Sequence, residues 1–169
     1  MAAGGSYALE ALVEQICDPG DAVMIAAPYW AGLDLSLSIH NDAKVVPIHV
    51  PLEEFFQVES VKYYETALEK STAPVKAVLV CNPHNPLGKC YPRETLQSML
   101  DFSHRNNLHY ISDEVYALSL HQNSENEGST ASFVSALSLA HGDELVHVIY
   151  SLSKDFGCSG IRLVEFPYL

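Results

Sequence analysis

The chain has 169 residues, 48% of them apolar, and a formal net charge of −12. This length and composition are typical of one folded domain with a hydrophobic core. The acidic balance argues against nucleic acid as a partner, because phosphate backbones are bound by clustered lysine and arginine. No apolar run approaches the roughly 20 residues that span a bilayer. The N-terminus also lacks the basic and apolar regions of a secretory signal, so we expect a cytoplasmic protein with no membrane partner.

The cysteines and histidines do not follow the spacing of metal ligands. Cys17, Cys81, Cys90 and Cys158 are scattered without a CxxC pair, and the eight histidines show no HxxxH spacing. We therefore expect four free thiols, as in a reducing compartment, and no metal site.

Helical and strand patterns alternate along the whole chain, with short connections between them. The first helix has an apolar stripe, with Ser6 as its expected N-cap and the Pro19-Gly20 pair at its end. The remaining expected elements, in chain order, are strand 22–27, helix 28–41, strand 43–50, helix 59–71, strand 75–81, helix 92–106, strand 108–112, helix 130–140, strand 145–150 and strand 160–166. Pro47 indicates an edge position or a bulge for its strand. The polar run 121–129 is expected to be a mobile surface loop.

This alternation predicts an α/β domain with a largely parallel sheet. In such sheets, ligands bind outside the carboxyl ends of the strands. Polar residues follow three of the expected strands, and they are Asn82 and Asn85 after the first, Asp113 and Tyr116 after the second, and Ser151, Ser153 and Lys154 after the third. We therefore expect one polar site where these three strands end.

The residues expected at this site match the chemical needs of pyridoxal phosphate. A lysine amine can hold an aldehyde as a Schiff base, and the cofactor also needs a carboxylate at its pyridinium nitrogen, donors to its phenolate oxygen and a phosphate cradle. The candidates for these needs, in that order, are Lys154; Asp113; Asn85 and Tyr116; and Gly5, Ser6, Ser151, Ser153 and Arg162. Trp30, just after a strand, offers an aromatic face for the cofactor ring.

Four motifs resemble those of the class I/II aminotransferases, which are fold-type-I pyridoxal phosphate enzymes. "SLSKDFGCSGIR" is similar to their S-x-S-K-x-x-G-x-x-G-x-R signature, "NPHNPLG" to their N-P-x-N-P-x-G turn, and "ISDEVY" to their D-E-x-Y strand end. "AGGSYALEAL" followed by "PGDAVMIAAPYWAGLD" resembles the region from the phosphate-binding helix to the ring-stacking aromatic. The residues within these motifs are most similar to those of the 1-aminocyclopropane-1-carboxylate synthase-like branch.

The resemblance implies a role for each candidate residue. Lys154 would carry the cofactor and later move the α-proton as general base, and Asp113 would pair with the pyridinium. Asn85 and Tyr116 would donate to the phenolate oxygen, and Trp30 would stack on the ring. The phosphate would be bound by Ser151 and Arg162 with the backbone N–H groups of Gly5 and Ser6. Tyr7 departs from the small or hydroxyl residue expected beside them.

The resemblance also implies a three-layer αβα fold, the partial large domain of the aspartate-aminotransferase-like fold, over residues 1–169. The family's N-terminal arm and C-terminal small domain have no counterpart in this sequence. The resemblance further implies an amino-acid substrate and, for full-length family members, usually a homodimer. Three functions stay open: an aminotransferase, a lyase such as a carbon–sulfur lyase, and a non-catalytic remnant that retains a partial fold and weak pyridoxal phosphate binding.

Overall fold

A computed structural model describes residues 2–120 and 132–165 of the chain. In chain order, the described elements are α1 (Gly5–Ile16), β1 (Ala22–Ala27), α2 (Gly32–Ser38), β2 (Lys44–His49), the 3₁₀ helix η1 (Val58–Ser60), α3 (Val61–Lys70), β3 (Val75–Cys81), α4 (Arg93–Arg105), β4 (His109–Asp113), α5 (Leu137–Ala140), β5 (Val146–Ser151), α6 (Leu152–Asp155), the 3₁₀ helix η2 (Ser159–Ile161) and β6 (Val164–Glu165). Among these, no helix is both long and apolar enough to cross a bilayer.

The described strands form one sheet in the order β2-β1-β3-β4-β5-β6. β1 to β5 are parallel, and only β6 pairs antiparallel, with β5. This arrangement confirms the prediction of a largely parallel sheet. Pro47 lies in β2, at one edge of the sheet, where its missing N–H deprives no further strand of a hydrogen bond. The edge position expected for this strand is therefore confirmed.

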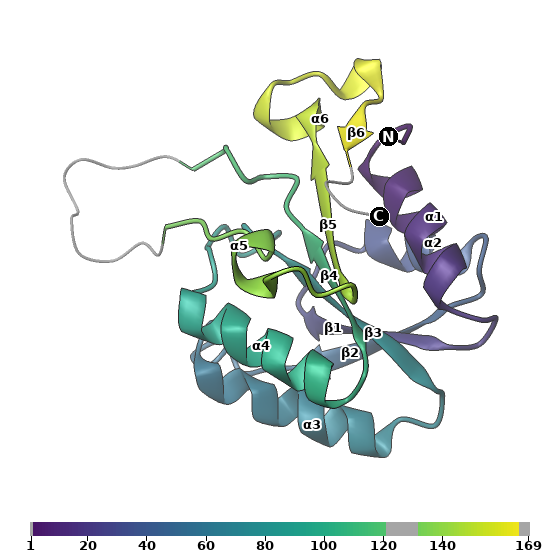
Figure 1. The fold of residues 1–169 in the computed structure, drawn as a ribbon, viewed down its shortest axis with the longest axis vertical. Helices are drawn as coiled ribbons and strands as arrows, with labels where there is room; N and C mark the ends of the chain where they lie inside the picture. Colours follow the sequence, from purple (N-terminus) through teal and green to yellow (C-terminus); the bar gives the residue numbers. More distant parts are fainter. Residues whose placement is uncertain (1, 121–131, 166–169) are drawn as a thin grey trace.

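Helices cover both faces of the sheet and make three layers, as expected (Figure 1). α1 and α2 bury their apolar sides against one face, around Val23, Leu79 and Ile111. α3, α4 and α5 pack on the other face, around Val78 and Tyr110. Both faces of the central strands are thus removed from water, which explains their nearly continuous apolar sequences.

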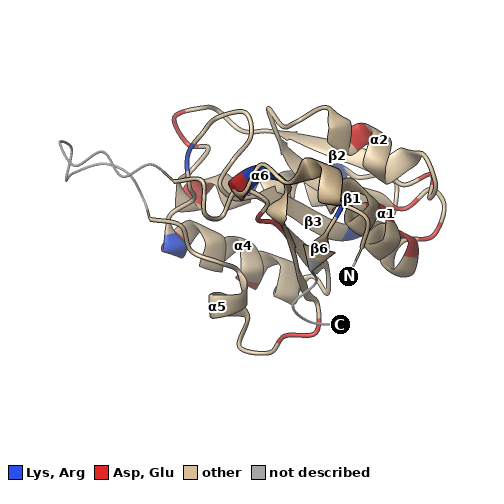
Figure 2. Ribbon diagram, turned by 90° about the horizontal axis from the view of Figure 1, so that it is seen from above, with Lys and Arg blue, Asp and Glu red and all other residues tan. Residues whose placement is uncertain are grey.

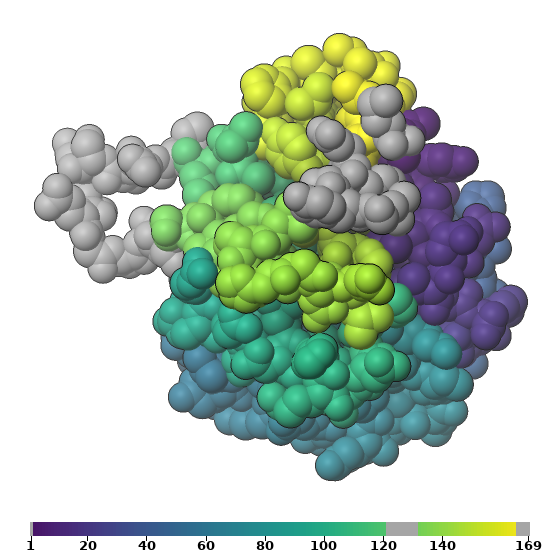
Figure 3. Space-filling model, in the orientation of Figure 1, coloured from purple at the N-terminus to yellow at the C-terminus, as the bar shows by residue number. Residues whose placement is uncertain are grey.

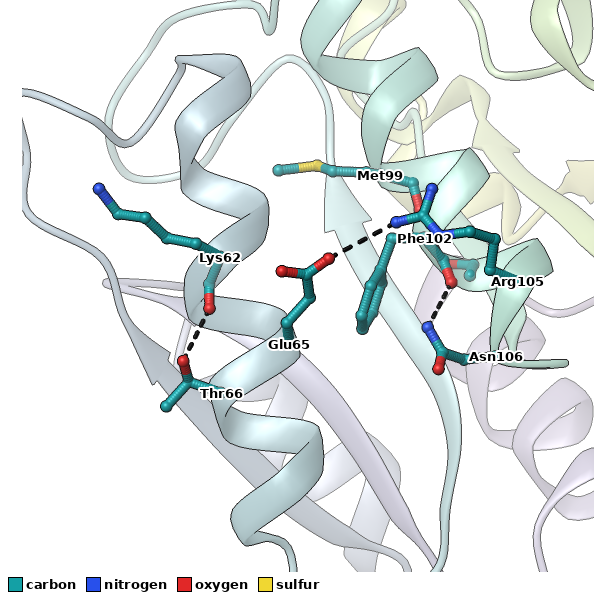
Figure 4. Close-up of polar contacts among 8 residues, drawn as sticks. Lys62, Glu65, Thr66, Met99, Phe102, Arg105 and Asn106 are labelled. Carbon is teal, nitrogen blue, oxygen red and sulfur yellow. Dashed lines mark hydrogen bonds and ion pairs between the residues drawn. The ribbon is translucent and has the colours of Figure 1, made fainter.

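The layer formed by α3 and α4 combines apolar packing with a few polar contacts (Figure 4). Phe102 of α4 packs edge to face on Tyr64 of α3, with ring centroids 6.0 Å apart. At the end of α4, Arg105 lies 3.6 Å from Glu65, and Asn106 donates to the carbonyl of Phe102 at 2.8 Å. Such exposed ion pairs contribute little stability, so burial of the aromatic side chains holds this layer.

Two helices near the N-terminus differ from their predicted bounds. Ser6 is not the N-cap of α1, because Gly4, with φ at 103°, begins the helix two residues earlier. The predicted helix 28–41 is shortened to α2. Residues 28–31 instead form a turn, which places Trp30 just beyond the carboxyl end of β1.

Three predictions near the C-terminus also change. The helix predicted over 130–140 is wrong for residues 132–136, and within the described residues 132–140 the helix is limited to α5. The strand predicted over 160–166 is reduced to β6, because η2 and the left-handed conformation of Arg162 (φ 55°) precede it. The loop predicted over 121–129, together with Thr130, Ala131 and Phe166, lies outside the described residues.

Candidate cofactor site

A pocket of about 250 Å³ lies at the carboxyl ends of β3, β4 and β5. Figure 2 shows this end of the molecule, with α6 carrying one basic and one acidic residue. All ten candidate residues from the sequence line the pocket: Gly5, Ser6, Trp30, Asn85, Asp113, Tyr116, Ser151, Ser153, Lys154 and Arg162. The three strand ends therefore converge as the topology requires, because parallel neighbours end at the same edge of the sheet.

Lys154 lies in the short helix α6, directly after β5. Ser151 caps this helix: its Oγ accepts a hydrogen bond from the backbone N–H of Ser153 at 3.1 Å. The side chain of Lys154 is exposed, with Nζ 5.8 Å from the ring centroid of Tyr116. The amine is thus held on a tight turn and is open to a ligand in the pocket.

Asp113 ends β4 at the base of the pocket and accepts a hydrogen bond from the backbone N–H of Val115 at 3.3 Å. Burial raises the pKa of this carboxyl to about 6, and the Val115 bond and the Lys154 ammonium oppose that rise. The neighbouring Glu114 carboxylate adds to it. A half-buried carboxylate with a raised pKa favours a cationic partner, since a positive charge would stabilise its ionised form.

Asn85 and Tyr116 face each other across the pocket. Asn85 Nδ2 lies 3.4 Å from the hydroxyl of Tyr116, a long hydrogen bond between the turns that follow β3 and β4. Both groups can donate to a ligand oxygen placed between them. Cys81, at the end of β3, also lines the pocket, and burial raises the pKa of its thiol, so it is a neutral group there.

The far side of the pocket is formed by the N-terminus of α1 and by Arg162. Ala2 bridges antiparallel to Val164, which brings the two segments side by side, as the adjoining purple and yellow surfaces in Figure 3 show. The guanidinium of Arg162 donates to the carbonyls of Ala3 (3.0 Å) and Ser159 (3.1 Å). Helix N–H groups beside a guanidinium make a site for an anion such as a phosphate.

Gly4 lets Arg162 reach this position. A Cβ atom at Gly4 would lie 1.8 Å from Nη2 of the guanidinium, and the φ of 103° also favours glycine. Trp30 depends on a glycine in a similar way, because its indole lies against Gly32. Neither glycine was singled out from the sequence, since both act through the close approach of a distant or neighbouring side chain.

One residue expected at the pocket points elsewhere. Asn82 is fully buried: its Oδ1 accepts from the N–H of Tyr91 at 3.0 Å, and its Nδ2 donates to the carbonyl of Val134 at 3.1 Å. The buried carboxylate of Glu114 likewise accepts from the N–H of Ala136 at 2.8 Å. These bonds fix the segment before α5 in a non-helical path, which explains why the predicted helix 130–140 is shorter.

Other features missed by the sequence analysis are small or local. Leu33, Val115 and Ser159 also line the pocket, and only the folded structure brings them there.

All four cysteines are free, as expected. Within the described residues, no group of three or more His, Cys, Asp or Glu is placed to hold a metal ion.

Known proteins match this chain over nearly its whole length. It is 61% identical over 168 residues to the "Probable aminotransferase tcpI" of Claviceps purpurea (strain 20.1), covering 98% of this chain and 40% of that protein. It is 38% identical over 166 residues to 1-aminocyclopropane-1-carboxylate synthase 7 of Arabidopsis thaliana, covering 96% of this chain and 37% of that one. The chain thus spans about 40% of the length of these curated relatives.

The fold also matches solved structures. A single mutant of the aspartate aminotransferase of Thermus thermophilus superimposes with a TM-score of 0.76 at 28% identity, covering 96% of this chain and 39% of that chain. A family model described as aminotransferase class I and II matches residues 1–163. This confirms the resemblance found in the sequence motifs, and the chain belongs to the class I and II aminotransferase family.

Proposed function

We propose that this chain forms the pyridoxal phosphate-binding part of an enzyme that transforms amino acids, with Lys154 as the attachment point of the cofactor. The observation that carries the proposal is the convergence of three strand ends on one pocket. An amine (Lys154), a half-buried carboxylate (Asp113) and a guanidinium (Arg162) line that pocket together. The family membership and the related aminotransferases support the same assignment.

The donor set of the pocket fits pyridoxal phosphate at both of its ends. The N-terminus of α1, the Ser151 and Ser153 hydroxyls and the Arg162 guanidinium suit the phosphate. The cradle depends on Gly4, because any side chain there would occupy the position of the Arg162 guanidinium. At the other end, the raised pKa of Asp113 is the property expected of a carboxylate that awaits a cationic ring nitrogen.

The remaining residues would orient the cofactor and restrict its motion. Asn85 and Tyr116 are close enough to donate together to one oxygen, and Trp30 offers an aromatic face at the mouth of the pocket. When bound, pyridoxal phosphate supplies an aldehyde that reacts with amines and a ring that accepts the electrons of a broken bond. Lys154, once freed by the substrate amine, would remove the proton from the substrate Cα with its Nζ.

The test is covalent attachment at one lysine. The purified chain is mixed with pyridoxal phosphate, reduced with borohydride and digested, and the modified peptide is identified by mass spectrometry. We expect modification at Lys154 with loss of the visible absorbance in Lys154→Ala. Lys89→Ala is the matched control, because Lys89 is exposed and lies outside the pocket. Modification spread equally over surface lysines would refute the proposal.

The relatives named as 1-aminocyclopropane-1-carboxylate synthases favour a second candidate function for the same site, a lyase or ring-forming reaction. Loss of the Cα proton is common to transamination and to lyase or ring-forming reactions, and the pocket residues serve this shared step. Product analysis with a panel of amino acids separates the two: transamination yields a keto acid and an aminated cofactor, whereas a lyase or synthase expels a substituent. A bound cofactor whose spectrum no amino acid changes would instead identify a non-catalytic binding protein.

A further inference from the structure

The carboxylate of Asp155 connects two turns of the pocket. Asp155 is the last residue of α6 and directly follows Lys154. Its Oδ2 accepts a hydrogen bond from the backbone N–H of Leu118 at 2.9 Å, and its Oδ1 accepts one from the hydroxyl of Ser119. These partners lie more than 35 positions earlier in the sequence, in the segment that follows β4. The lysine turn is thus attached directly to the neighbouring strand end.

The segment that Asp155 holds also carries Tyr116. It is a tight turn, in which the N–H of Ala117 donates to the carbonyl of Glu114 at 3.0 Å and the N–H of Ser119 to that of Tyr116 at 3.0 Å. The carboxylate binds the last two residues of this turn, next to the point where the Tyr116 carbonyl is engaged. A shift of Leu118 or Ser119 would therefore be transmitted to Tyr116 through a short, hydrogen-bonded stretch of backbone.

Lys154 and Tyr116 follow different strands, β5 and β4, but line the same pocket. Nζ of Lys154 lies 5.8 Å from the Tyr116 ring centroid, and the Tyr116 hydroxyl in turn contacts Asn85. Hydrogen bonds to a carboxylate are shorter and stronger than those between neutral groups. Asp155 therefore has the position and the chemistry to fix the distance between the amine and the phenol.

We propose that Asp155 is a positioning residue, which clamps the turn of Tyr116 to the turn of Lys154 so that amine and phenol act on the same ligand. The clamp belongs to the protein alone and needs no cofactor to form. Its consequence for the ligand rests on the proposed function. The two parts are tested by separate experiments, so that the failure of one is distinguishable from the failure of the other.

The first experiment measures amide hydrogen exchange of the full chain without cofactor. In Asp155→Ala, the amide of Leu118 loses its acceptor, and we expect its exchange to be at least about tenfold faster. Asp155→Asn keeps one acceptor oxygen, so its Leu118 exchange rate should fall between those of the wild type and Asp155→Ala. Ser119→Ala should leave the Leu118 amide protected. Asp101→Ala is the control, because Asp101 is an exposed aspartate on α4 that accepts a hydrogen bond from Gln97 of the same helix, away from the pocket. Unchanged exchange at Leu118 in Asp155→Ala overturns the proposal.

If Asp155→Ala does not fold, as judged by its thermal melting curve, Asp155→Asn and Ser119→Ala decide the matter. Faster exchange of Leu118 in Asp155→Asn than in Ser119→Ala supports the clamp. Equal exchange in both variants and in the wild type contradicts it.

The second experiment follows the absorbance of the cofactor bound at Lys154 as the pH is varied. A phenol that donates to the cofactor phenolate oxygen lowers the midpoint pH of this spectral transition, because it stabilises the deprotonated form. We expect Tyr116→Phe and Asp155→Ala each to raise the midpoint, the latter by about half a pH unit or more. The double variant should shift no further than Tyr116→Phe alone, since Asp155 acts through Tyr116. Additive shifts would show that Asp155 acts by another route and would overturn the inference.

The two proposals fail in different ways. If borohydride fixes no cofactor at Lys154 in the wild type, the proposed function fails, whereas the exchange of Leu118 still decides whether Asp155 clamps the turn. If the cofactor is fixed at Lys154 but the midpoint in Asp155→Ala equals that of the wild type, the proposed function stands and the positioning role of Asp155 is refuted.

Discussion

The indole of Trp30 lies directly against Gly32. A Cβ atom at residue 32 would fall 2.3 Å from Cζ2 of the indole and 2.4 Å from Cη2, well inside the roughly 3.5–4.0 Å at which non-bonded carbon atoms pack. The position of the aromatic face at the pocket mouth therefore depends on the absence of a side chain at the first residue of α2.

Gly32→Ala is expected to displace the indole without destabilising the fold. Alanine favours the helix by up to about 1 kcal/mol over glycine, so the melting temperature should stay the same or rise. Trp30 is the only tryptophan of the chain, and its fluorescence reports the change directly. We expect altered emission and weaker quenching by pyridoxal phosphate. Gly160→Ala is the control, since a Cβ there meets no atom within 4 Å. Identical spectra for both variants would contradict the prediction.

Gly4→Ala is expected to impair binding of the phosphate group. The new methyl group would occupy the position of the Arg162 guanidinium and would strain a backbone with φ at 103°. We expect at least about tenfold weaker binding of pyridoxal phosphate, because a charged hydrogen-bond donor is displaced from the phosphate site. Pyridoxal, which lacks the phosphate, should bind with nearly unchanged affinity. Equal losses for both ligands would show that Gly4 supports the whole pocket rather than its anion site.

Asp113→Asn is expected to stabilise the cofactor-free chain at alkaline pH. The folded pKa of Asp113, about 6, lies above the ordinary value of 3.8, mainly because of burial. Its favourable contribution is therefore complete below about pH 4 and is lost as the pH rises through about 6. Asparagine removes the buried charge and can still accept the Val115 bond, so we expect a gain of about 1–3 kcal/mol at pH 8 and none at pH 4. Urea unfolding at both pH values measures it.

The exposed Asp101 supplies the control for that measurement. Asp101→Asn removes the same charge far from the pocket and should change the free energy of unfolding little at either pH. A gain in Asp113→Asn that is equal at pH 4 and pH 8 would rule out the ionised carboxylate as its cause.

A histidine pair at the other end of the sheet should make the fold sensitive to acid. Nδ1 of His109 and Nε2 of His147 lie 2.9 Å apart at the start of β4 and in β5. Burial lowers the pKa of both histidines, and that of His147 falls to about 4. The positive charge of Lys76 lowers the pKa of His109 further, whereas the negative charge of Asp143 partly opposes the fall at His147. Folded values below the ordinary 6.5 mean that stability is complete above about pH 6.5 and is lost as the pH falls toward 4.

In His147→Asn, the free energy of unfolding should therefore fall less steeply as the pH is lowered. Between pH 7 and pH 4.5, the wild type should lose about 1–2 kcal/mol more than this variant, a figure that allows for the partial exposure of the pair. His40→Asn, at an exposed histidine, is the control and should follow the wild type. Parallel curves for the wild type and His147→Asn would refute the role of the pair.

The sequence predicted the site better than it predicted the bounds of the helices. Asp113 ends a strand, and Asn85 and Lys154 follow the ends of two others. The order of parallel neighbours then brings the three residues together, so strand ends and topology suffice to place them. The helix expected over 130–140 is shorter because Asn82 and Glu114 bind its backbone from distant positions. Such long-range bonds override local propensity and leave no periodic signal in the sequence.

The same reason explains why Asp155 and Gly4 were missed. The partners of Asp155 lie 36 and 37 positions away, and the hydrogen bond from Arg162 to Ala3, beside Gly4, spans 159 positions. Both contacts depend on where the folded chain places two turns. Serine is a frequent N-cap, so the sequence alone favours Ser6 for that position. The bounds of α1 were decided by Gly4 instead.

The bridge between Ala2 and Val164 has a consequence for how the protein is made. One wall of the pocket joins Arg162 to Ala3, which lie 159 positions apart, so a nascent chain that still lacks the Arg162 segment and β6 has no complete anion cradle. Contacts between such distant segments form late and slow the overall rate of folding. The pocket should therefore become able to hold its cofactor only after β6 has been synthesised and has paired beside the N-terminus of α1.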